Sequence, residues 1–240
     1  MELDDDYDKL KTTLQTNCSL LEQGLFKLGY ESRSDRMHGV YRLFFESFKG
    51  VEAVLKCIDI TAYSQAATIL RNAIEQVSII KVLVDHQEVI DEYNDFAQRR
   101  FDLITEKPNA LENFEEKFKN RLNKKSKKIE YLDFGWLEKL DPNKNSIEDI
   151  IELADFKDLI SWRKYYNNFV HSSLSFTDLA IKGVRFLIEN IIYISAVIYD
   201  HCVCMLHNLN GYNFYVNNIN TAFNYIGAFE EITVRNRAKK

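Results

Sequence analysis

Hydrophobic positions recur along most of this chain every three or four residues, which is the spacing of one face of an α-helix. The clearest stripe covers about residues 39–58, with apolar side chains at Val40, Phe44, Phe48, Val51, Leu55 and Ile58. A second stripe starts near Ala62 and contains Ala66, Leu70, Ala73, Val77, Ile80 and Val84. Because the connection between the two is short, the pattern predicts an antiparallel helix pair.

Further helical segments lie on both sides of this pair. Weaker periodicity predicts a first helix, and two Ser-x-x-Asp patterns, at Ser146 and at Ser175, are typical of helix starts. Pro108 ends one helix, and Asn210-Gly211 ends the last. The additional helices are expected over about 3–29, 87–106, 155–171 and 175–208.

Glycine and proline are scarce, with 8 and 2 in 240 residues, which favours long helices over a many-stranded sheet. The predicted fold class is therefore all-α: an antiparallel bundle of four to five long helices with flanking shorter ones. We expect a single domain over residues 1–240, with 107–145 as a helical or loop insertion.

The amino-acid composition indicates where the protein is located rather than which reaction it catalyses. The net charge of −5 gives no general attraction to nucleic acid, so any RNA contact needs a local basic patch. The apolar run 186–206 contains Glu189 and Asp200, which favours a core helix over a membrane span. Four cysteines in no disulfide or metal framework fit a reducing compartment. We therefore expect a cytoplasmic protein with no membrane partner.

The stretch RKYYNNFVHSS, residues 163–173, contains the strongest candidate chemistry. Arg163, Asn167 and His171 are four residues apart and follow one helix face. His171 falls in the last turn, where the negative end of the helix dipole favours a protonated imidazole. An imidazole there can transfer protons, and arginine can grip a phosphate with paired hydrogen bonds. The alternative is a histidine that only satisfies a carbonyl or a carboxylate.

Arg71 and Glu75 form a second candidate pair, one helical turn apart. Arg71 follows Leu70 of the apolar stripe, so we expect it to be partly buried and to need a partner such as Glu75. The pair is either a structural ion pair or the border of a pocket under His171.

The segments AATILRNAIEQVSIIKVLVD and YYNNFVHSS together resemble the HEPN superfamily of helical domains, in particular an uncharacterised bacterial branch. In that branch one helix carries R-x-x-x-E, here Arg71 and Glu75. A later helix ends in Tyr-x-x-x-x-His-x-Ser, here Tyr166, His171 and Ser173. The resemblance covers roughly residues 39–105 and 155–205.

Many HEPN proteins are metal-independent ribonucleases whose motif is Arg, four to six residues, then His, with a polar residue after the Arg. In this chain His171 takes the His position and Asn167 the polar one, while Tyr166 stands at the Arg position. Arg163 is the nearest arginine, separated from His171 by seven residues. The resemblance implies a cofactor-free site in which His171 moves the proton and Arg163 or Arg71 stabilises the phosphate.

The same resemblance implies RNA as substrate, a homodimer with one motif from each subunit, and a role as a toxin or phage-defence effector, with an antitoxin or another protein as partner. Two alternatives stay open. The first is a catalytically silent HEPN-like module that binds RNA, a nucleotide or a protein, and the second is a purely structural helical dimer.

Three other patterns have simpler explanations. The basic cluster at 119–128 follows acidic residues of the same predicted helix, which is the charge order that the helix dipole favours. In HCVCMLH, residues 201–207, the cysteines and histidines cannot all converge from one straight helix, so no metal site is expected. The aromatic segment after residue 211 suits packing or a dimer interface better than base stacking.

Overall fold

The computed structural model describes residues 5–31, 36–105, 134–170 and 181–210. These residues form seven α-helices and two short 3-10 helices, with no strand among them. The predicted all-α class is confirmed.

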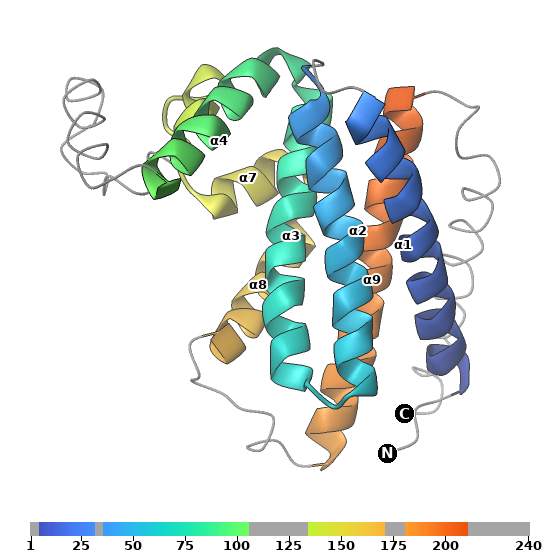
Figure 1. Cartoon of the computed structure of the whole chain (residues 1–240). Coiled ribbons are helices and arrows are strands. Elements are labelled where there is room, and N and C mark those ends of the chain that lie inside the picture. Colours follow the sequence, from blue (N-terminus) through green and yellow to red (C-terminus); the bar gives the residue numbers. More distant parts are fainter. Residues whose placement is uncertain (1–4, 32–35, 106–133, 171–180, 211–240) are drawn as a thin grey trace.

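Four long helices build the central bundle: α1 (Asp5–Glu31), α2 (His38–Asp59), α3 (Tyr63–Asp85) and α9 (Ile181–Asn210). α2 runs antiparallel to α1 and α3, which confirms the predicted helix pair (Figure 1). α9 runs in the same direction as α3, because the long connection 86–180 brings the chain back to the starting end of the bundle (Figure 1).

The core lies where the apolar stripes predict it. All six stripe positions of α2 are buried, and in α3 only Val84 of its six remains partly exposed. Phe48 of α2 and Tyr199 of α9 meet edge to face, with ring centroids 5.7 Å apart. This contact ties the last helix to the predicted pair.

Within α9, residues Gly183–Leu209 are long and apolar enough to cross a membrane, judged by length and composition alone. In the structure α9 packs against α1, α2 and α3, and 61% of its most apolar window is buried inside the protein. α9 is therefore surrounded as a core helix of a bundle is. The cytoplasmic location of the protein stays a prediction.

The connection from α3 to α9 contains the shorter elements, namely η1 (Gln87–Val89), α4 (Ile90–Thr105), η2 (Gly135–Lys139), α7 (Ile147–Leu153) and α8 (Lys157–Val170). Trp136 and Leu137 of η2 are buried, and the Trp136 ring meets Tyr93 of α4 at 5.4 Å. Of the segment 107–145, residues 107–133 lie outside the described part, and 134–140 pack against the body.

α8 lies along α3, and the turn before it sets that placement (Figure 1). The predicted capping box at the start of α7 is present: the Ser146 side chain accepts from the Asp149 amide, and the Asp149 carboxylate accepts from the Ser146 amide. After α7, Asp155 adopts a left-handed conformation with φ of 58°, which reverses the chain into α8. α8 then ends at Val170.

Candidate functional site

Glu75 of α3 lies at the centre of an ionic network that joins three helices. One of its oxygens, Oε1, accepts a hydrogen bond from Arg163 Nε of α8 at 2.7 Å and forms an ion pair with Arg71 Nη2 at 2.9 Å. Arg163 also donates through Nη1 to Glu148 Oε1 of α7 at 2.7 Å. We call the surroundings of this network the α3–α8 seam, made up of Arg71, Glu75, Glu148, Arg163, Tyr166 and Asn167.

The network lies between core and surface. The Arg163 side chain is 12% exposed, and those of Arg71 and Glu75 are 21% and 22% exposed. Its two guanidinium groups and two carboxylates balance in charge, which is what partly buried ions require. The predicted ion pair between Arg71 and Glu75 is therefore confirmed, and it belongs to a larger group.

Three polar atoms of the seam are buried and have no hydrogen-bond partner among the described residues: Arg71 Nε, the Tyr166 hydroxyl and Asn167 Oδ1. Tyr166 is fully buried, and this burial, together with nearby Tyr165, raises the pKa of its phenol far above the usual range. The hydroxyl is therefore neutral. Buried polar groups almost always have partners, so these atoms mark a place where water or a ligand belongs.

Tyr166 is held in place by its neighbours on α8. Its ring stacks on Trp162 at 6.1 Å and meets Tyr165 edge to face at 5.4 Å. Tyr166 is thus a packed core residue.

The structure brings three of the seven residues that the sequence selects into direct contact. Arg71, Glu75 and Arg163 are in direct contact, and Asn167 follows Arg163 by one turn of α8. His171 and Ser173 lie outside the described residues, and α8 ends at Val170, directly before His171. Sequence analysis missed Glu148, whose link to Arg163 depends on how α7 and α8 fold against each other.

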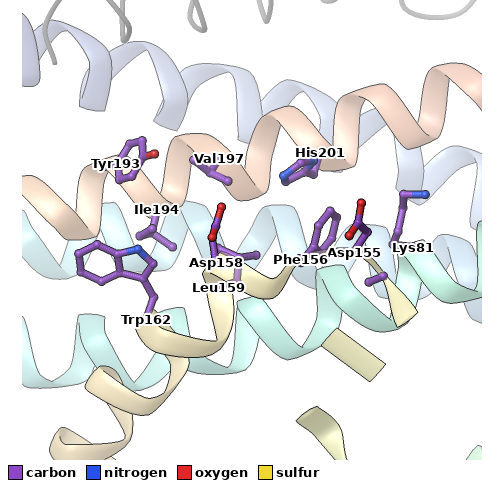
Figure 2. A pocket seen from close by; sticks show the side chains of 11 residues that line it. Lys81, Asp155, Phe156, Asp158, Leu159, Trp162, Tyr193, Ile194, Val197 and His201 are labelled. Atoms are coloured by element: carbon purple, nitrogen blue, oxygen red, sulfur yellow. The ribbon is translucent and has the colours of Figure 1, made fainter. Parts of the chain in front are cut away.

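A concave surface lies along α8, where Asp158, Leu159 and Trp162 line it (Figure 2). It is a groove of about 470 Å³ between α8 and α9. Trp162 lines it, but none of the six seam residues does. Arg163 therefore does not face this groove, and the two features are separate.

Within the described part of the chain, no three His, Cys, Asp or Glu side chains are grouped closely enough to hold a metal ion. In the 201–207 motif, Cys202 is fully buried, Cys204 is exposed, and the His201 ring packs on Phe156 with centroids 4.3 Å apart. The side chains of His201, Cys202 and Cys204 therefore lie in three different environments rather than around one common point.

The fold and the seam define an all-α helical-bundle protein with a partly buried ionic network. The chain belongs to a family of unknown function, DUF5677, whose match covers residues 37–182. This range extends from the start of α2 to the beginning of α9 and so includes every seam residue. No curated protein matches the chain, and no solved structure does.

Proposed function

We propose that this protein is a HEPN-like, metal-independent endoribonuclease whose α3–α8 seam holds an RNA phosphate. One observation supports this most: a single oxygen of Glu75 on α3 lies 2.7 Å from Arg163 Nε and 2.9 Å from Arg71 Nη2, and Arg163 belongs to α8, the helix that ends directly before His171. Arginine side chains can stabilise the charge that develops on a phosphate, and an imidazole can transfer the proton, so these groups can support phosphodiester cleavage without a metal.

In the proposed reaction, His171 removes the proton of an RNA 2′-hydroxyl, and the 2′-oxygen attacks the adjacent phosphorus. The bond from phosphorus to the 5′-oxygen breaks, and that oxygen takes up a proton. The products are a 2′,3′-cyclic phosphate and a free 5′-hydroxyl. No external oxidant, metal or cofactor enters this balance.

Arg71 is the better candidate for the phosphate contact. Arg163 already donates from Nε and Nη1 to two carboxylates. Arg71 donates from Nη1 to Asn72 Oδ1 and pairs through Nη2 with Glu75, but its buried Nε has no partner among the described residues. In this scheme Glu75 and Arg163 are positioning residues. Glu75 holds the Arg71 guanidinium group in place before the substrate binds, and Arg163 holds Glu75.

The biological setting that fits this activity is a cytoplasmic homodimer acting as a toxin or phage-defence effector, held in check by an antitoxin or another protein partner. Uncontrolled cleavage of cellular RNA stops growth, so expression of the wild-type chain in bacteria should arrest growth. Expression of His171→Ala should not.

A catalytically silent binding module is the second candidate. It is favoured by Tyr166, which is buried at the position of the family's arginine, and by the two carboxylates on Arg163. Such a module would hold RNA, a nucleotide or a protein at the same seam without cutting it.

Incubation of the purified protein with end-labelled RNA in excess EDTA separates the two. The nuclease proposal expects cleavage with cyclic phosphate ends, its loss in His171→Ala, and full activity in His86→Ala, a partly exposed histidine directly after α3. RNA binding without cleavage by a folded wild-type protein would support the silent module. Cleavage that needs a metal, or that survives His171→Ala, would refute the proposed chemistry.

A further inference from the structure

The groove between α8 and α9 is built as a small-molecule site (Figure 2). Asp158, Leu159 and Trp162 of α8 form one wall, and α9 forms the other. The Asp158 carboxylate projects between two pairs of rings, Trp162 with Tyr193 on one side and Phe156 with His201 on the other (Figure 2). Its volume of about 470 Å³ lies in the range of sites that enclose small ligands.

The charge of the groove is negative. Asp155 and Asp158 are exposed carboxylates that form no ion pair with any described residue. Lys81 is the only lysine or arginine of the lining, and its ammonium already pairs with Asp85. Burial, and then the charge of Lys81, lower the pKa of His201, so its imidazole is neutral at pH 7.

The start of α8 explains why an acidic residue occurs at position 158, since carboxylates are favoured in the first turn of a helix. Aromatic rings flank that exposed carboxylate in the groove, and it forms no ion pair with a described residue. Aromatic faces attract cations and repel anions, so the rings and the two acids select the same ligand charge. Leu159 and Ile194 are buried beneath them and supply an apolar floor.

We propose that this groove binds a small organic cation, in which an ammonium group on an aromatic or apolar body pairs with Asp158 between the rings. The site is independent of the proposed ribonuclease, because no seam residue lines the groove. An experiment that refutes one of the two proposals therefore does not refute the other.

Two probes with the same ring and chain length but opposite charge test this: phenethylamine and 3-phenylpropionate. Calorimetry should detect phenethylamine binding at up to millimolar concentration and no binding of 3-phenylpropionate. Trp162 is partly exposed whereas Trp136, the second tryptophan, is buried, so phenethylamine should also change tryptophan fluorescence. Trp162→Phe should abolish that change.

Asp158→Asn should weaken phenethylamine about tenfold or more, the size expected for one charged hydrogen bond. The matched control is Asp91→Asn, an exposed aspartate in the first turn of α4, which should bind like the wild type. Equal affinity for both probes, full affinity in Asp158→Asn, or no phenethylamine binding by the folded wild type would each overturn the proposal.

Discussion

Replacing Glu75 with glutamine tests the seam most sharply, because the change keeps the shape of the side chain and removes only its charge. In the wild type, Glu75 Oε1 accepts a charged hydrogen bond from Arg163 at 2.7 Å and forms an ion pair with Arg71 Nη2 at 2.9 Å. In Glu75→Gln the same position offers a neutral amide. The two guanidinium groups then lie together with only Glu148 to offset them.

The expected cost follows from that hydrogen bond and that ion pair. A charged hydrogen bond contributes about 1.5–3 kcal/mol and a neutral one about 1 kcal/mol, so the bond to Arg163 loses roughly 0.5–2 kcal/mol, and the ion pair with Arg71 adds up to about 1 kcal/mol. Repulsion between the arginines adds to this, whereas the partial exposure of all three side chains reduces it. We expect Glu75→Gln to lower the free energy of unfolding by about 1–3 kcal/mol, or Tm by roughly 2–12 °C for a chain of this size.

Urea unfolding followed by circular dichroism at 222 nm measures the change. The control is Asp91→Asn, which removes an ion pair of similar length, 2.8 Å to Arg36, between side chains that are 45% and 68% exposed. That variant should lose less than about 1 kcal/mol. If Glu75→Gln costs no more than Asp91→Asn, the network is not a structural element and the reasoning from burial is refuted.

Three further predictions follow from single features. Tyr166→Phe should not lower stability in thermal unfolding, because the lost hydroxyl is buried without a partner among the described residues and its removal relieves a desolvation cost; a loss above about 1 kcal/mol would show that it has a partner. Burial raises the pKa of Asp200 from 3.8 to about 7, so the folded protein binds a proton there that the unfolded chain releases. Stability should therefore fall as pH rises from about 4 to 7, and Asp200→Asn should be more stable than the wild type at pH 8 by roughly 2–4 kcal/mol but not at pH 4; equal stability at both pH values would contradict this. Light scattering at micromolar concentration should give twice the chain mass of 28.2 kDa. The mass of a single chain would contradict a ribonuclease site formed by two subunits.

The sequence predicts the bundle well because helix periodicity is a local property. The α2 and α3 stripes place their buried faces correctly, since a residue's position on a helix follows from counting alone. The Arg71–Glu75 pair is predictable for the same reason, since four residues separate its members on one helix.

Contacts between segments that are distant in the sequence cannot be predicted from helix periodicity. Arg163 and Glu75 are 88 residues apart, and their hydrogen bond exists only because α8 folds back along α3. Glu148 joins them through the turn at Asp155, whose left-handed backbone no periodic pattern indicates. The groove is likewise formed by α8 and α9 together, so neither helix alone predicts the isolated carboxylate of Asp158.

Binding of RNA to the cleavage-deficient His171→Ala protein tests the central claim most directly, because it asks whether the seam arginines hold the phosphate. On that background Arg71→Met should weaken RNA binding tenfold or more, and Arg71→Lys should also weaken it, because lysine keeps the charge but lacks the planar fork. Arg185→Met, which removes an exposed arginine of α9, should bind like its parent. If fluorescence anisotropy gives the same affinity for folded Arg71→Met as for its parent, the seam does not bind RNA and the proposed function is contradicted.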